Sequence, residues 1–301
     1  MQSPKYSTVI KSDYANEINW HYLSANRNAI RLLEENPKKI NWVRLSRNPN
    51  AIHLLEENLD KIDWYWLSSN PNAIHLLEEN QDEIDWGQLS ANPNAMHLLE
   101  GYQYEIDWER LSANPNAMHL LEENQDEIDW GELSANPNAL HLLEENLEKI
   151  NWKRLSANPN AMHLLEENED KIDWDELSAN PNAICLLEEN YEKINWRYLS
   201  SNPNAMHLLE ENQYEIDWVV LSTNPGAVDL LKKHTRKSLC YFFSKNRNIM
   251  ELICELDYGA MKRSMQPFAE DLASYVFHPL RMYQIAERNN IPFDELINEI
   301  Y

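Results

Sequence analysis

The sequence predicts an all-α fold: an α-solenoid of about ten 22-residue two-helix repeats, closed by a helical C-terminal cap. Ten of the eleven tryptophans recur at one fixed interval, Asn-Pro pairs recur at the same interval, and the unit never changes length. Self-similarity at a fixed period of 20 to 50 residues indicates a stacked repeat array. The tryptophans of the series are Trp20, Trp42, Trp64, Trp86, Trp108, Trp130, Trp152, Trp174, Trp196 and Trp218.

One unit, LSANPNAMHLLEENQDEIDWGE from Leu111, shows the first expected helix. Asn114 suits the N-cap and the proline after it suits the first helical position, where no N–H donor is needed. Ala117, Met118 and Leu121 share one face by their spacing. We therefore expect a helix that starts at Asn114-Pro115 and ends near Asn124.

A second, shorter helix is expected after it. Asp129 is placed to cap a helix that begins at Trp130, and Glu132 as its third residue has the spacing for a capping box. Ile128 before the cap and Leu133 inside the helix have the spacing of a hydrophobic staple. Proline in nearly every unit excludes a continuous coiled coil. Each unit should therefore give two short antiparallel helices.

Stacking must stabilise these helices, because helices this short are marginal in water on their own. A leucine-rich horseshoe is the rival fold, since its units have a similar length. Its Leu-x-Leu-x-x-Asn spacing is missing here, so the capping signals favour two helices. With helices packing roughly 8–10 Å apart, ten units predict a rod or superhelix on the order of 100 Å long.

The predicted organisation has three parts: an N-terminal cap or extension over 1–17, the repeat solenoid over 18–231, and a divergent helical cap over 232–301. An echo of the repeat survives in the last part at Asn246-Arg247. Repeat arrays need terminal units that cover the last apolar face. A basic cluster opens this segment, formed by Lys232, Lys233, Arg236 and Lys237.

The net charge of −24 belongs to the repeats. Residues 226–301 carry 10 basic and 10 acidic side chains, which leaves 16 basic and 40 acidic ones in residues 1–225. Such a field repels phosphate backbones, so the array is not expected to bind nucleic acid, whereas a partner with a basic surface would be attracted. Solubility is the simpler role of this charge.

The sequence lacks the segments that are typical of membrane and secreted proteins. No stretch reaches the roughly 20 apolar residues that cross a bilayer, and no signal peptide is recognisable. The three cysteines have neither disulfide nor zinc spacing. We expect no membrane association and an intracellular, non-secreted protein.

Each position of the unit forms a column along the array. The tryptophan column is expected in the core, because aromatic side chains contribute large burial energies. The histidine column, which includes His119, could suggest a metal ladder, but successive members should lie too far apart to share an ion. We expect His119 to pair instead with Glu122 or Glu123 on its own helix. The glutamate columns are expected to be a solvated face, with an acidic ridge for a basic ligand as the alternative.

The two residues after each tryptophan vary between units, as in Tyr65-Trp66 and Gly131-Glu132. Stacking does not dictate them, so they are either unconstrained surface or the positions that recognise a partner. Tyr, Trp and Arg dominate many interfaces. The candidate protein-binding residues are Tyr22, Arg44, Tyr65, Trp66, Arg110, Arg154, Arg197 and Tyr198.

Units of the form LSxNPNAIHLLEENxxKIDW, followed by VFHPLR near the C-terminus, resemble a repeat family of giant DNA viruses of the mimivirus kind. The resemblance covers roughly residues 18–301. It implies a helical repeat protein made in an infected host cell, located in the host cytoplasm or the virion. It implies no activity or catalytic residue. Arg27 in the first unit and Gly101 in one glutamate column depart from the pattern.

Function is therefore expected to be non-enzymatic. The sequence has no Gly-rich phosphate loop, no His-Glu-x-x-His and no Gly-x-Ser-x-Gly, so neither a cofactor nor a metal is expected. The first hypothesis is a scaffold that binds a host or viral protein of unknown identity along one face of the solenoid. The alternative is a structural virion or assembly component that acts as a rigid rod. An enzyme with its activity in the C-terminal cap is the least favoured hypothesis.

Overall fold

The structure is a computed structural model that describes residues 8–10, 18–234, 244–248 and 254–256. The chain forms two compact units, Met1–Lys11 with Cys254–Tyr301, and Ser12–Ile253. In the first unit, β1 (Thr8–Ile10) pairs antiparallel with β2 (Cys254–Leu256), and Thr8 lies opposite Leu256. The predicted N-terminal extension and helical C-terminal cap lie largely outside the described residues.

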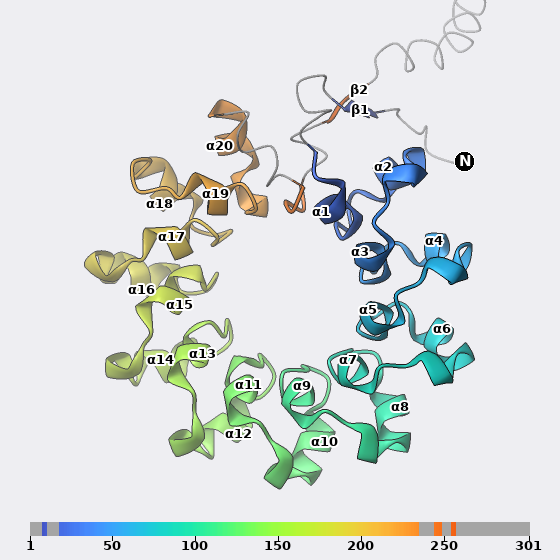
Figure 1. The fold of residues 1–301 in the computed structure, drawn as a ribbon. Helices are drawn as coiled ribbons and strands as arrows, with labels where there is room; N and C mark the ends of the chain where they lie inside the picture. The colour runs from blue at the N-terminus through green and yellow to red at the C-terminus, as the bar shows by residue number, and fades with distance from the viewer. Residues whose placement is uncertain (1–7, 11–17, 235–243, 249–253, 257–301) are drawn as a thin grey trace, which may run out of the picture. The chain divides into compact units, whose positions relative to one another are not determined.

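The second unit is an α-solenoid, as predicted (Figure 1). Each repeat holds an odd-numbered helix, an even-numbered helix and, in most repeats, a short 3₁₀ helix. The odd-numbered helices are α1 (Trp20–Ser24), α3 (Trp42–Ser46), α5 (Trp64–Ser68), α7 (Trp86–Ser90), α9 (Trp108–Ser112), α11 (Trp130–Ala135), α13 (Trp152–Ser156), α15 (Trp174–Ala179), α17 (Trp196–Leu199) and α19 (Trp218–Leu221).

The even-numbered helices are α2 (Ile30–Glu35), α4 (Ile52–Glu56), α6 (Ile74–Glu79), α8 (Met96–Gly101), α10 (Met118–Glu123), α12 (Leu140–Glu144), α14 (Met162–Glu166), α16 (Ile184–Glu189), α18 (Met206–Glu211) and α20 (Val228–Lys233). The 3₁₀ helices are η1 (Pro37–Lys39), η2 (Leu59–Lys61), η3 (Gln81–Glu83), η4 (Gln103–Glu105), η5 (Gln125–Glu127), η6 (Leu147–Lys149), η7 (Glu169–Lys171), η8 (Tyr191–Lys193) and η9 (Pro225–Ala227).

Odd-numbered helices begin where the capping pattern predicted. The Asp129 carboxylate accepts a hydrogen bond from the backbone N–H of Glu132 at 2.8 Å, and α11 starts at Trp130. The predicted capping box is wrong, because the backbone N–H of Asp129 donates to the Ser112 hydroxyl of the preceding repeat at 3.0 Å and the Glu132 carboxylate contacts Arg154. The cap residue therefore fixes both the start of its helix and the contact to the repeat before it.

The even-numbered helices begin later than predicted. The expectation that Asn114 caps α10 is wrong, because α10 starts at Met118 after a turn over Asn114–Ala117. The Asn114 side-chain oxygen accepts the N–H of Asn116 at 3.0 Å, which is the Asx-turn geometry that asparagine favours. Its side-chain amide is thereby directed at the neighbouring repeat. The predicted end of this helix at Asn124 is confirmed.

The core consists of small and aliphatic side chains. Ala117, Leu121 and Leu111 are fully buried, as are their counterparts in the other repeats. The ten tryptophans of the series are half-buried rather than enclosed, so the predicted core position of this column is wrong. The rings lie at the edge of the core because tryptophan is the first residue of each odd-numbered helix, next to a cap that is in most repeats only partly buried.

Buried asparagine amides join each repeat to the one before it. The side-chain amide of Asn136 donates to the backbone carbonyls of Ser112 and Asn114 at 3.0 Å each, and its oxygen accepts the N–H of Asn138. Asn136 is 1% exposed, so its hydrogen-bonding groups are satisfied inside the protein. The same arrangement joins successive repeats at Asn26, Asn48, Asn70, Asn92, Asn114, Asn158, Asn180, Asn202, Asn224 and Asn246.

The array of this unit closes on itself. The amide of Asn26 in the first repeat donates to the carbonyls of Ser244 and Asn246, at 3.2 and 2.7 Å. The N–H of Asn19 donates to the Ser244 hydroxyl at 3.0 Å. These are the bonds that every other repeat makes with its predecessor, and Ser12–Ile253 has the length of eleven repeats. The regular hydrogen bonds therefore continue past residue 231 into the echo at Asn246.

Closure replaces the open rod or superhelix that the sequence predicted, and the packing of the helices explains it. From α1 through α17, each odd-numbered helix packs on the next, whereas the even-numbered helices meet one another over fewer residues. Figure 1 shows the odd-numbered helices on the inner side of the curve and the even-numbered helices on the outer side. Each repeat therefore turns the array in the same direction.

The asparagine contacts predict a large effect of a small substitution. We expect Asn136→Ala to lower the free energy of unfolding by about 2–4 kcal/mol, because two buried carbonyls lose their donor. Asn138→Ala is the matched control, since its amide makes one exposed bond to the Pro115 carbonyl. We expect the control to cost about 1 kcal/mol or less. Urea denaturation followed by circular dichroism measures both, and equal losses would contradict the role of Asn136.

Closure predicts that the first repeat behaves like an internal one. We expect Asn26→Ala to destabilise the protein about as much as Asn136→Ala, because Asn26 also donates to two carbonyls. In an open array, the first repeat would be a free end and the Asn26 amide would be hydrogen-bonded to water. A loss below about 1 kcal/mol in urea denaturation would therefore show that the array is open in solution.

Candidate interaction surface

The variable positions are the second and third residues of the odd-numbered helices. In α5 the Asp63 carboxylate accepts the backbone N–H of Trp66 at 3.1 Å, so the cap holds the backbone and leaves both side chains free to vary. Side chains at these positions do not enter the asparagine contacts between repeats. These two positions of each odd-numbered helix are therefore the candidate interaction surface, on helices that line the inner side of the curve.

Tyr65 and Trp66 form an aromatic cluster on α5. Their ring centres are 5.1 Å apart in an edge-to-face arrangement, and the Arg47 guanidinium lies 5.1 Å from the Trp66 ring centre. Tyr65 is 43% exposed, whereas Trp66 is half-buried. A rigid aromatic pair with one exposed ring is suited to bind an apolar or cationic group.

Tyr22 and Arg44 contact neighbouring residues. The Lys245 ammonium lies 4.2 Å from the centre of the half-buried Tyr22 ring, so this side chain takes part in the closure of the array. The Arg44 Nε donates to His21 Nε2 at 2.9 Å, across adjacent repeats. Both predicted residues thus have a structural partner.

Arg110 and Arg154 pair with acidic side chains. Arg110 Nε lies 3.2 Å from the carboxylate of Asp107, the cap of its own helix. Arg154 makes a two-pronged contact with Glu132 of the preceding repeat, at 2.7 and 2.9 Å. These arginine side chains are 41% and 47% exposed, so a partner carboxylate can still reach them.

Arg197 and Tyr198 line a hollow of about 390 Å³, together with Ser201 and Val220. Arg197 is 75% exposed and sits 3.7 Å from the Asp217 carboxylate. Tyr198 is half-buried, and its backbone carbonyl accepts the Ser201 hydroxyl. A hollow with an exposed cation at one side and an aromatic ring at its wall can hold a side chain of a partner.

The eight predicted residues come from six helices and do not form one patch. Those on α1, α3 and α5 lie on adjacent repeats, whereas Arg197 and Tyr198 belong to the separate hollow on α17. Three further residues of these sites were not among the eight: Arg47, Ser201 and Val220, of which Val220 lies at a variable position of α19. Arg47 could have been found, because most repeats have alanine or serine at its position.

The histidine column lies on the even-numbered helices. His119 Nε2 is 2.8 Å from the carboxylate of Glu100 in the preceding repeat, so the predicted pairing with Glu122 or Glu123 on its own helix is wrong. The reason is placement: His119 is the second residue of α10 and lies across from the end of α8. The other pairs join His53, His75, His97, His141, His163 and His207 to the equivalent glutamates of their preceding repeats.

These pairs do not assemble a metal centre. Within the described ranges, no group of three or more His, Cys, Asp or Glu side chains is arranged to hold a metal ion. Each histidine has one carboxylate beside it, whereas a structural zinc site needs four ligands. Of the basic cluster, Lys232 and Lys233 lie in α20, and Arg236 and Lys237 fall outside the described residues.

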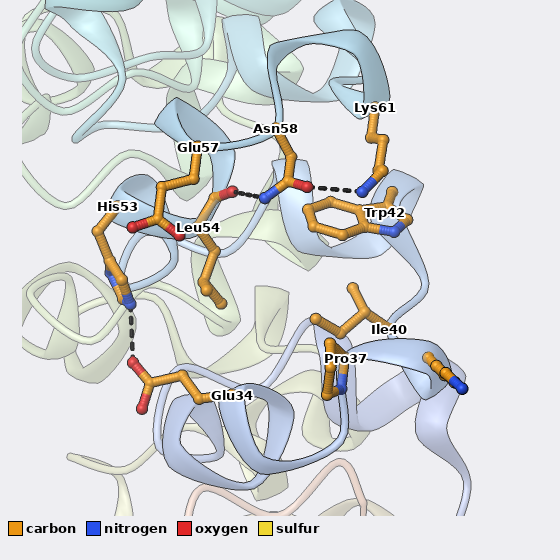
Figure 2. Close-up of a pocket in the computed structure, with 10 residues that line it drawn as sticks. Glu34, Pro37, Ile40, Trp42, His53, Leu54, Glu57, Asn58 and Lys61 are labelled. Carbon is orange, nitrogen blue, oxygen red and sulfur yellow. Dashed lines mark hydrogen bonds and ion pairs between the residues drawn. The ribbon is translucent and has the colours of Figure 1, made fainter.

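A second hollow of about 640 Å³ lies between successive repeats near α3 and α4 (Figure 2). The Trp42 ring and Ile40 form its apolar side, and Glu34 and His53 pair across its other side at 2.9 Å. The Lys61 ammonium lies 4.6 Å from the Trp42 ring centre. This contact was not predicted from the sequence, although lysine recurs at one fixed offset after several tryptophans.

Comparisons with known proteins give no relative: no family model, curated protein or solved structure matches this chain. In the part of the chain that the structure describes, no helix is both long and apolar enough to cross a bilayer.

The single-carboxylate histidine pairs predict that divalent metal does not stabilise the fold. We expect the purified protein to melt at the same temperature with a chelator and with added Zn²⁺, because the described residues offer no complete ligand set that would couple metal binding to folding. Thermal denaturation followed by circular dichroism tests this. A chelator-induced loss of helix would show a metal site that these pairs do not account for.

Proposed function

We propose that this protein is a non-enzymatic protein-binding scaffold that recognises its partner through the candidate interaction surface. The observation that carries the proposal is that each repeat has constant positions, which join it to its neighbours, and variable positions, which do not. Asparagine, serine and leucine at fixed positions make the contacts between repeats, and the second and third residues of the odd-numbered helices vary on this constant framework. Variable residues on a constant framework are how repeat arrays form binding surfaces.

The Tyr65–Trp66 cluster and the Arg197–Tyr198 hollow are the proposed anchors. Both combine an aromatic ring with a guanidinium group, and both include an exposed side chain. Tyr, Trp and Arg are the residue types that contribute most to many interfaces. The glutamates at the ends of the even-numbered helices are a weaker candidate, because in seven of these helices the first of them already pairs with a histidine.

A host or viral protein is the class of partner that the resemblance to giant-virus repeats implies, inside the cell or in the virion. The rigid-rod alternative has less support. An array whose first repeat bonds to its last has no free terminal repeat for end-to-end stacking.

The anchors predict a selective loss of binding. We expect replacement of Tyr65, Trp66, Arg197 and Tyr198 by alanine to leave the helical spectrum intact and to weaken capture of the partner at least tenfold, since interface anchors often cost more than about 2 kcal/mol each. The measurement is affinity capture from infected-cell extract, quantified by mass spectrometry. The captured protein is then titrated against the purified scaffold.

The matched control changes Glu122 and Glu144 to glutamine on the even-numbered helices. We expect this variant to keep its affinity and to show a slower, salt-dependent association. If the glutamine variant loses the partner and the alanine variant keeps it, the binding surface is the outer, acidic one.

A further inference from the structure

A lysine of the chain covers the tryptophan ring in five repeats. It follows the tryptophan at one fixed offset, on the 3₁₀ helix, and its ammonium is 4.2–4.6 Å from the ring centre. This is the geometry of a cation–π interaction. The five pairs are Lys39–Trp20, Lys61–Trp42, Lys149–Trp130, Lys171–Trp152 and Lys193–Trp174.

The pair at Trp42 shows what receives the ammonium group (Figure 2). Lys61 donates to the side-chain oxygen of Asn58 at 2.6 Å, and the amide of Asn58 donates to the Leu54 carbonyl at 2.9 Å. The asparagine is therefore held with its oxygen toward the ammonium. We call this combination of a tryptophan face and an oriented asparagine oxygen an ammonium station.

Two repeats have the station without the lysine. At Trp64 and Trp108, the residues at the position of this lysine are Glu83 and Glu127. Among the contacts described, no lysine, arginine or second aromatic ring lies against either tryptophan. Both tryptophan residues are partly exposed to solvent.

The asparagine of the station is in place in both repeats. Asn80 and Asn124 donate to the carbonyls of Leu76 and Leu120 at 2.8 Å, as Asn58 does in its own repeat. In the described part of the chain, the side-chain oxygens of these two asparagines accept no hydrogen bond from the protein. Each station therefore presents a ring face and an acceptor with no cation of its own.

Local charge favours a cation from outside. The exposed acidic residues Glu83 and Asp60 lie on the 3₁₀ helices beside Trp64, at positions where the Trp42 hollow has Lys61 and Lys38. In the repeat of Trp108, the exposed acidic residues include Glu123 at the end of α10, and Asp126 and Glu127 on η5. Carboxylates near an aromatic face strengthen its attraction for an ammonium group.

The repeat between the two stations carries exposed aromatic surface. Trp86 packs against Tyr102 with ring centres 4.8 Å apart, so its face is occupied. Tyr104 on η4 is 80% exposed. Three successive repeats thus present a station, an aromatic pair and a second station.

We propose that Trp64 and Trp108 each bind a lysine side chain from a basic segment of a partner protein. The five lysines of the chain identify the occupant, since each shows the position that an ammonium group takes on an equivalent ring. The surplus of carboxylates in the repeats supplies the complementary charge. The inference rests on the proposed scaffold function and adds a second binding surface, separate from the odd-helix variable positions.

The test uses the full-length protein and a fluorescent decalysine peptide as the probe. The station variant, Glu83→Lys with Glu127→Lys, places at each empty station the residue that fills it in five other repeats. The control variant, Asp82→Lys with Asp126→Lys, makes the same change in net charge at the preceding, exposed positions of the same 3₁₀ helices. Fluorescence anisotropy at fixed ionic strength gives the affinity of each protein.

We expect the station variant to bind decalysine about tenfold more weakly and the control variant to lose threefold or less, as two cation–π contacts imply. The indole N–H signals of Trp64 and Trp108 should shift on titration in NMR spectra, and those of Trp130 and Trp152 should not. Equal weakening by both variants would overturn the proposal, because the general acidic field would then explain binding. Unshifted Trp64 and Trp108 signals would also overturn it.

The scaffold proposal is tested separately from this one. Loss of the natural partner through the Tyr65, Trp66, Arg197 and Tyr198 variant, with decalysine binding retained, would support both surfaces. If that variant binds both decalysine and the natural partner normally, the stations remain supported and the odd-helix surface is contradicted.

Discussion

The structure depends on buried asparagine side chains whose amides reach into the preceding repeat. Each amide donates to two backbone carbonyls of its neighbour, and each side-chain oxygen orders the turn that follows it. A buried amide that lost these partners would be costly. The repeats therefore have one favourable register against one another, and every helix start and turn is built around it.

Closure follows from the same interaction. An open array of this kind would leave the last asparagine contact unmade and an apolar face uncovered at each end, which is why repeat proteins need terminal caps. Here the bonds at Asn26 satisfy the first repeat with the carbonyls of the eleventh. Packing of the odd-numbered helices on one another supplies the constant curvature that brings the two together. In the closed array, the first and last repeats take the place of terminal caps.

The fold class could be predicted from the sequence because the period and the caps at residues such as Asp129 are local signals. Curvature could not, because it depends on small differences between inner and outer packing that accumulate over many repeats. The role of Asn114 was misassigned for a related reason: an Asn-Pro pair suits a helix start or a turn, and the contact that decides between them lies a whole repeat away in the chain. His119 was misassigned likewise, since its carboxylate partner belongs to another repeat.

The variable positions of the candidate surface can be read from the sequence, whereas their contacts cannot. Variation at Tyr65 and Trp66 is visible in the sequence, whereas the Arg47 contact that completes the cluster requires two repeats side by side. The lysine that covers Trp42 lies at a fixed offset from the tryptophan, and this offset is visible in the sequence. Its contact with the ring could be inferred only once the ring was known to be half-buried. A fully buried tryptophan would have no open face, and the exchange of lysine for glutamate at residue 83 would alter surface charge alone. Because the ring lies at the edge of the core, the exchange of lysine for glutamate also leaves the aromatic face uncovered. Charge and binding capacity therefore change together from repeat to repeat, while the asparagine contacts stay constant.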